Sequence, residues 1–78
     1  PNPARNYVNV NYSIETDESV SIEIYNLLGN IVLNQELGFQ NASTYNEQIN
    51  ISGLSNGLYL LRISAGNSQI TKKLKVNQ

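Results

Sequence analysis

The side chains that could carry chemistry in this chain are few, and they form two groups of opposite charge. Carboxylates gather within residues 15–23 and ammonium groups within residues 69–78, at Glu15, Asp17, Glu18 and Glu23 and at Lys72, Lys73 and Lys75. The sequence contains no His and no Cys, which removes the commonest general base, the cysteine nucleophile, the thiolate metal ligand and the disulfide. A serine nucleophile would need a lysine or a carboxylate as its base. The composition therefore favours a protein that is not an enzyme.

The acidic group could in principle act as a carboxylate pair or as a calcium site. Glu15, Asp17 and Glu18 fall in an expected polar turn, where solvated charges are the simplest interpretation. Calcium takes about six to eight oxygen ligands, and the glycine-containing loop spacing of a calcium site is missing here. We therefore expect no metal and no cofactor.

Charge and length limit the partners and the organisation of the chain. The formal net charge is −1, so there is no basic footprint for nucleic acid. No apolar stretch approaches the roughly 20 residues of a transmembrane helix. The 78 residues are expected to make a single domain, 1–78. Because the sequence opens at Pro1 rather than at Met, we interpret it as part of a larger or processed protein.

The elements that must position these charges are β-strands. Apolar and polar residues alternate with a period of two along the whole chain, and helical spacing is missing. Strands are expected at residues 8–14, 20–24, about 31–36, 45–51, 58–64 and 70–76, with 37–43 as a looser connection or a short edge strand. Gly29 is expected at positive φ in the turn 27–30.

The segment 58–64 is predicted to be the central strand. It is apolar on both faces except at Arg62, which is typical of a strand covered on both sides. Because Arg62 marks the face nearer to water, Tyr59, Leu61 and Ile63 are assigned to the core.

Six or seven short strands joined by turns predict an all-β domain of two packed antiparallel sheets, with a closed barrel as the competing solution. Tyr59 begins a strand just after Gly57, an arrangement similar to the tyrosine corner of immunoglobulin-like folds, in which the phenol hydrogen-bonds to the backbone a few residues upstream. This feature favours an immunoglobulin-like antiparallel β-sandwich.

Lys72 disagrees with the pattern of the last strand, because it shares the expected buried row with Ile70, Leu74 and Val76. Its stem could pack along the end of the sandwich while the ammonium reaches water. Alternatively, another protein could bind the last strand as an exposed edge or a basic strip. Both interpretations stay open at this point.

Four sequence blocks lie in order along the chain. They are Pro1-Asn2-Pro3, residues 24–29 (IYNLLG), residues 54–63 (LSNGLYLLRI) and residues 71–74 (TKKL). Together they resemble the type A C-terminal sorting domain of proteins exported by the type IX secretion system of certain Gram-negative bacteria. By position, Pro1, Asn2 and Pro3 match the family's first motif, Gly57 and Tyr59 its central motif, and Lys72 and Lys73 its terminal motif, while Gly29 ends the second block. Lys75 departs from the family, whose members often have an apolar residue there.

The resemblance implies a function that the composition does not. The domain would be the last module of a cargo protein, whose other domains precede it, and it would direct the cargo from the periplasm across the outer membrane to the cell surface or the medium. The implied partners are the outer-membrane translocon, shuttle components and a sortase-like peptidase, which commonly removes the domain and can join the cargo to a surface lipopolysaccharide. We expect recognition to use the terminal strand, 70–78, and the turn around Gly57.

Two other functions remain as alternatives. An immunoglobulin-like or fibronectin-like spacer would fold without conferring export. A carbohydrate-binding module would need exposed aromatic rings, and the sequence offers no Trp and only Tyr7, Tyr25 and Tyr45 as outward-facing candidates.

Overall fold

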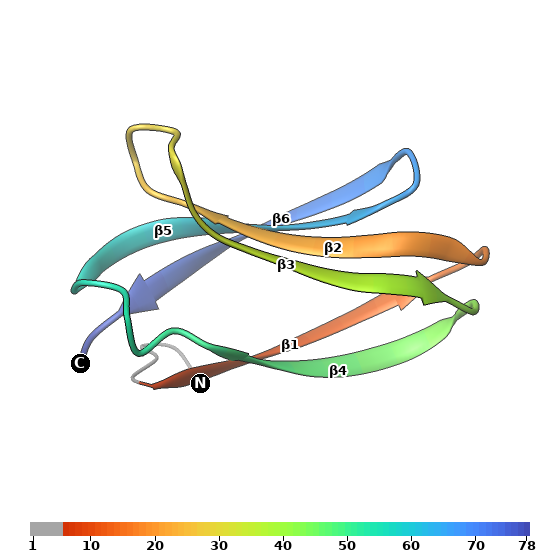
Figure 1. Cartoon of the computed structure of the whole chain (residues 1–78), viewed down its shortest axis with the longest axis horizontal. Helices are drawn as coiled ribbons and strands as arrows, with labels where there is room; N and C mark the ends of the chain where they lie inside the picture. The colour runs from red at the N-terminus through yellow and green to blue at the C-terminus, as the bar shows by residue number, and fades with distance from the viewer. Residues whose placement is uncertain (1–5) are drawn as a thin grey trace.

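Six antiparallel strands account for most of residues 6–78, the part of the chain that the structure, a computed structural model, describes. No helix occurs among these residues, which confirms the prediction of an all-β domain. The strands are β1 (Tyr7–Ile14), β2 (Glu18–Tyr25), β3 (Ile31–Gln40), β4 (Ser43–Asn50), β5 (Gly57–Ala65) and β6 (Ser68–Val76), as labelled in Figure 1.

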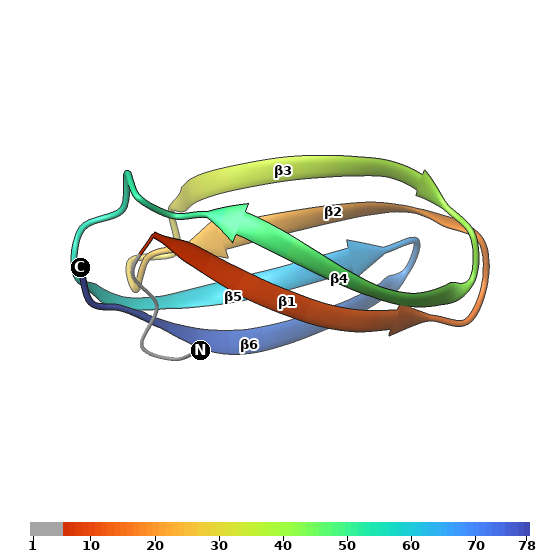
Figure 2. The same ribbon diagram turned by 90° about the horizontal axis from the view of Figure 1, so that it is seen from below.

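The strands form two sheets that face each other. One sheet has four strands in the order β3-β2-β5-β6, and the other has two, β1 and β4. Figures 1 and 2 show the two-stranded sheet lying across one face of the four-stranded sheet. The arrangement is an open sandwich consistent with an immunoglobulin-like fold, and it excludes the closed barrel.

The hydrophobic core lies between the two sheets and follows the alternation of the sequence. Every second residue of each strand points inward, and the five isoleucines Ile22, Ile24, Ile49, Ile51 and Ile63 are 2% exposed or less. Tyr59, Leu61 and Ile63 are buried as predicted. The remaining buried hydrophobic residues are Val10, Tyr12, Ile14, Val20, Ala65, Leu74 and Val76.

The expectation that β5 is covered on both sides is wrong. The strand is central in its sheet, but Leu58 is 54% exposed and Leu60 is 38% exposed. The physical reason is that the described chain supplies a single covering layer, β1 and β4, which packs on one face of the four-stranded sheet. The opposite face, which we call the outer face, is open to solvent.

The expectation that β3 ends near residue 36 is also wrong. The strand continues to Gln40, and the connection to β4 is only residues 41–42. Gly38 has φ +80° and lies where the pairing with β2 shifts register, so the glycine forms a bulge that the strand passes through. The Tyr12 hydroxyl donates a hydrogen bond of 2.6 Å to the Gln40 side-chain oxygen, which ties this extension to β1.

The tyrosine corner predicted at Tyr59 is confirmed. The Tyr59 hydroxyl donates a hydrogen bond of 2.7 Å to the backbone carbonyl of Ser55, while its ring is buried in the core. The corner fixes the chain that enters β5 against the sheet. Tyr59 therefore has a structural role and does not present its side chain to a partner.

Replacing Tyr59 by Phe tests the corner. The change leaves the ring in place and removes the donor to a partly buried carbonyl, so Tyr59→Phe should lower the free energy of unfolding by about 1–3 kcal/mol. Tyr45→Phe is the matched control, because the Tyr45 hydroxyl also donates to the carbonyl four residues upstream, Asn41, at 2.5 Å but in an exposed position. Its cost should be below about 1 kcal/mol, since water can replace the phenol. Urea unfolding of both variants gives the comparison, and equal losses would argue against the corner as a stabilising device.

Tyr12 makes stability depend on pH in the alkaline range. Burial of its ring, opposed by the hydrogen bond to Gln40 and aided by the charges of Glu47 and Tyr45, raises the pKa of the Tyr12 phenol above its ordinary value. The folded state therefore holds this proton more tightly than the unfolded state, so the contribution is complete below about pH 10 and is lost as the pH rises through the folded-state pKa.

The corresponding measurement is the free energy of unfolding at about pH 8 and about pH 10.5 for the natural chain and for Tyr12→Phe. The two proteins share every other ionisable group, so the difference between them isolates the contribution of Tyr12. The natural chain should lose more stability than the variant over this interval. A parallel loss in both would show that Tyr12 does not contribute.

Candidate recognition surface

The outer face of the four-stranded sheet carries exposed apolar side chains at one end. Alternation along β5 sends Leu58 and Leu60 to this face, and the strand register places Tyr25 beside Leu60 and Ile31 beside Tyr25. The turn between β2 and β3 adds Leu27 and Leu28, and it rises from the sheet on the side away from β1 and β4 (Figure 1). We call Tyr25, Leu27, Leu28, Ile31, Leu58 and Leu60 the outer-face patch.

The turn of the outer-face patch is built by Asn26 and Gly29. The Asn26 side-chain oxygen accepts hydrogen bonds from the N–H groups of Leu28 at 3.0 Å and Asn30 at 2.9 Å. Gly29 has φ +88°, which confirms the predicted conformation. This local bonding directs both leucines into solvent, where Leu27 is 70% exposed and Leu28 is 86% exposed.

A shallow hollow of about 360 Å³ lies within the outer-face patch. It is lined by Tyr25, Asn26, Leu27, Gly29, Leu60, Arg62 and Thr71. Single exposed apolar residues are ordinary on protein surfaces, but a contiguous group with a concave centre is characteristic of an interaction site. Thr71 of β6 borders the hollow. The outward lysines of β6 are paired across the ladder with patch residues, Lys73 with Leu60 and Lys75 with Leu58.

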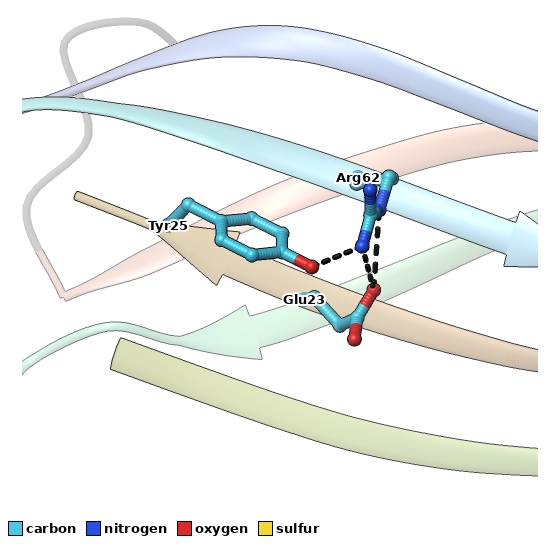
Figure 3. Close-up of polar contacts among 3 residues, drawn as sticks. All are labelled: Glu23, Tyr25 and Arg62. Atoms are coloured by element: carbon cyan, nitrogen blue, oxygen red, sulfur yellow. Dashed lines mark hydrogen bonds and ion pairs between the residues drawn. The ribbon is translucent and has the colours of Figure 1, made fainter. Parts of the chain in front are cut away.

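Three side chains in the middle of the outer face form a compact polar group, shown in Figure 3. The Arg62 guanidinium donates to the Glu23 carboxylate at 3.1 and 3.2 Å, and it also donates to the Tyr25 hydroxyl. The guanidinium carbon lies 4.8 Å from the centre of the Tyr25 ring. The Glu23 carboxylate is thus paired with Arg62, whose guanidinium lies over the Tyr25 ring.

The residues matched to family motifs are not all brought together. Gly29 lies in the turn of the outer-face patch, and Gly57 begins β5 opposite Val76 of β6 at the same end of the sandwich. Lys73 faces outward beside Leu60. Tyr59 points into the core. Pro1, Asn2 and Pro3 lie outside the described residues.

Lys72 and Lys73 lie on opposite faces of β6, because consecutive residues of a strand alternate. Lys72 is on the inner row, as the pattern indicates, yet it is exposed. Its ammonium donates a hydrogen bond of 3.3 Å to the backbone carbonyl of Asn11 in β1. Ile70, expected on the buried row, is 42% exposed. The sandwich is therefore uncovered at this part of its inner face.

Sequence reasoning missed the leucines of the outer-face patch. The available signal was strand alternation. Leu58 and Leu60 lie on the same face of the strand as Arg62, which already marked the face nearer to water. Leu27 and Leu28 were assigned correctly to a turn, and their adjacency to Leu60 depends on the pairing of β2 with β5.

Among residues 6–78, no three His, Cys, Asp or Glu side chains cluster closely enough to hold a metal ion. Nor does the same range include a helix with the length and hydropathy needed to cross a bilayer.

The chain matches a known protein family. The family described as "Secretion system C-terminal sorting domain" matches residues 1–77, which is nearly the whole chain. No curated protein and no solved structure matches significantly.

The turn of the outer-face patch can be tested through Gly29. A Cβ at this position would meet no atom within 4 Å, but φ is +88°, so Gly29→Ala should cost about 1–2 kcal/mol through backbone strain alone. Gly53→Ala is the matched control, because Gly53 also has open space around it and lacks a positive φ. It should change the free energy of unfolding by less than about 0.5 kcal/mol. Thermal or urea unfolding measures both, and equal effects would contradict the strained turn.

Proposed function

This chain belongs to the family of secretion system C-terminal sorting domains, and we propose that the secretion machinery recognises it through the outer-face patch. Membership makes the chain a C-terminal sorting signal of the type IX secretion system, which implies export of its cargo to the cell surface or the extracellular space. The proposal adds which surface carries the signal.

The observation that supports this assignment most strongly is the exposure of Leu58 and Leu60 on a central strand. Folding does not require large apolar side chains there, because the core lies on the other face of β5. Leaving apolar surface in water forgoes about 25 cal/mol per Å², and a partner that covers these leucines recovers that energy. Their retention on an open face is therefore best explained by a binding partner.

The outer-face patch, together with Lys73 beside Leu60, joins three of the four family blocks. Residues 24–29 supply Tyr25 and the two turn leucines, residues 54–63 supply Leu58 and Leu60, and residues 71–74 supply Lys73. These blocks are far apart in the sequence but converge at one end of the outer face through the ladders β2–β5 and β5–β6. This geometry supports the expectation that the terminal strand and the Gly57 turn take part. The proposed contact uses the side chains that point outward from this part of the sheet.

The wider route is part of the same proposal. The domain carries no reaction of its own and is bound by the outer-membrane translocon and its shuttle components after the attached cargo has reached the periplasm. A sortase-like peptidase then removes the domain and joins the cargo to a surface lipopolysaccharide. The absence of His and Cys from the sequence supports the non-enzymatic role.

The placement of the tyrosines gives a carbohydrate platform no support. Tyr45 is stacked on Tyr12 with ring centres 5.5 Å apart, and Tyr25 lies under the Arg62 guanidinium. Tyr7, 49% exposed, is at the start of β1 on the other sheet. The three rings do not form one exposed aromatic surface.

The test is an export assay with a fluorescent reporter that bears a periplasmic signal and ends in residues 1–78. In a host with the type IX machinery, Leu58→Thr combined with Leu60→Thr should reduce secretion at least about tenfold, the effect of losing about 1.4 kcal/mol of binding. Threonine retains β-propensity, so the fold should persist. Phe39→Thr is the matched control, because Phe39 is 68% exposed and lies beside Ser19 at the opposite end of the outer face.

The outcomes separate the family function from the proposed surface. Failure of the unmodified fusion to be secreted, or equal secretion in a host without the machinery, would contradict the sorting function. Secretion that persists in the double variant while its thermal unfolding is unchanged would contradict the outer-face patch alone. Equal loss in the Phe39→Thr control would point to a general effect of surface polarity.

A further inference from the structure

The two sheets of the sandwich do not close on the side where β1 and β6 lie. Each of these strands is paired on one edge only within residues 6–78, β1 with β4 and β6 with β5. Figure 2 shows β1 and β6 at the same side of the molecule, one in each layer. Their facing edges border a furrow, which we call the β1–β6 groove.

The β1–β6 groove consists of two hollows in line. The first, about 260 Å³, has Val8, Val10 and Leu74 on its walls. The second, about 480 Å³, includes Ile14, Ile63 and Ile70. β5 supplies the apolar floor, with Leu61 under the first hollow and Ile63 under the second. Ile70 remains 42% exposed although it lies on the inner row, so this is the part of the core that the two-stranded sheet does not reach.

The free edge of β1 offers backbone hydrogen bonds to this groove. The Asn11 carbonyl points into it, since it accepts from Lys72 of β6. In an antiparallel strand the N–H and C=O of every second residue point to the same edge, which places those of Asn9 and Ser13 beside Asn11. The Asn6 carbonyl points the other way and accepts from the Ile51 N–H at 2.8 Å, as the same alternation requires.

Lys72 occupies the middle of the groove between the two hollows. Its stem rises from the inner row of β6, and its ammonium bonds a carbonyl that a neighbouring strand would otherwise use. A charged lysine at a free edge is a common protection against unwanted strand pairing. It also means that an incoming strand must offer the ammonium a new partner.

We propose that the β1–β6 groove accepts an extended strand from another protein, which pairs with the free edge of β1 and carries a carboxylate that takes Lys72 from Asn11. The added strand becomes the third strand of the small sheet and covers Ile70. This inference does not depend on the outer-face patch, which lies on the other face of the four-stranded sheet.

Charge complementarity defines the chemistry of the incoming strand. Lys72 borders the first hollow, while Glu15 and Glu18 border the second. Glu15 directly follows β1 and is four residues after Asn11, about 13 Å away at roughly 3.3 Å per residue. An antiparallel partner therefore places a basic residue near Glu15 and, four residues later, an acidic residue near Lys72, with one apolar residue between them facing the floor.

The probe is a blocked octapeptide with the sequence Thr-Lys-Thr-Val-Thr-Asp-Thr-Val, titrated into isotope-labelled chain 1–78 and followed by nuclear magnetic resonance. We expect saturable binding below 1 mM peptide. Amide hydrogen exchange of Asn9, Asn11 and Ser13 should slow at least tenfold. The amides of Val10 and Tyr12 should not change, because they face β4.

A charge cycle tests the role of Lys72. Replacing Asp by Asn in the peptide should weaken binding at least threefold to the natural chain and not at all to Lys72→Met, which keeps an apolar stem of similar length. Lys73→Met is the matched control and should retain the full Asp preference, because Lys73 faces outward. If Lys72→Met still binds the Asp peptide more tightly than the Asn peptide, Lys72 is not the partner of the carboxylate and that part of the proposal is wrong.

Three results would overturn the groove itself. The first is that the peptide shows no saturable binding up to 1 mM. The second is that binding slows amide hydrogen exchange at the edge of β3 or β4 and not at β1. The third is that exchange of the β1 amides slows without peptide as the protein concentration rises. The last result would assign the edge to a second copy of this chain and not to another protein.

Discussion

The buried interface between a two-stranded and a four-stranded sheet is the interaction on which the rest of this domain depends. It collects the fully buried isoleucines of β2, β4 and β5, together with Ile51 just after β4, in one layer, and the described chain contains no second layer. Two consequences follow from the mismatch in width. The outer face of the larger sheet must contact solvent or a partner. One side of its inner face stays uncovered, because the smaller sheet stops at its edge strand β1.

Strand alternation distributes the chemistry of the terminal motif between these two surfaces. Lys72 and Lys73 are neighbours in sequence, but one crosses the open side of the sandwich to β1 and the other lies beside Leu60 on the outer face. A pair of adjacent lysines on a strand is therefore not one basic site. Each lysine acts with the surface that its face of β6 belongs to, and a change at one leaves the other in place.

The sequence predicted the parts of this structure that depend on local patterns. Period-two alternation identified the core residues of β5, Gly29 predicted the conformation of its turn, and the spacing of Gly57 and Tyr59 predicted the corner. The parts that failed depend on what lies elsewhere in the molecule. Apolar residues on both faces of β5 do not reveal how many layers cover the sheet. Gly38 is typical of a strand end, but here it lies in a bulge and the strand continues. The hydrogen-bond partner of Lys72 is 61 residues away in the chain.

The energetics of the two surfaces indicate how each can be used. Burying an exposed leucine fully yields about 1.5–3 kcal/mol, whereas association and ordering cost about 4–15 kcal/mol. The outer-face patch contains four leucines, and a single contact does not bury any of them fully. The patch therefore supports a transient association from which the partner is readily released. A strand added to β1 contributes backbone hydrogen bonds along a whole edge as well as cover for Ile70, and backbone pairing of this kind is less sensitive to individual side chains. The outer-face patch is thus suited to brief binding and the β1–β6 groove to longer-lived binding. A partner that contacts both would bind first through its apolar surface and then remain bound through its strand.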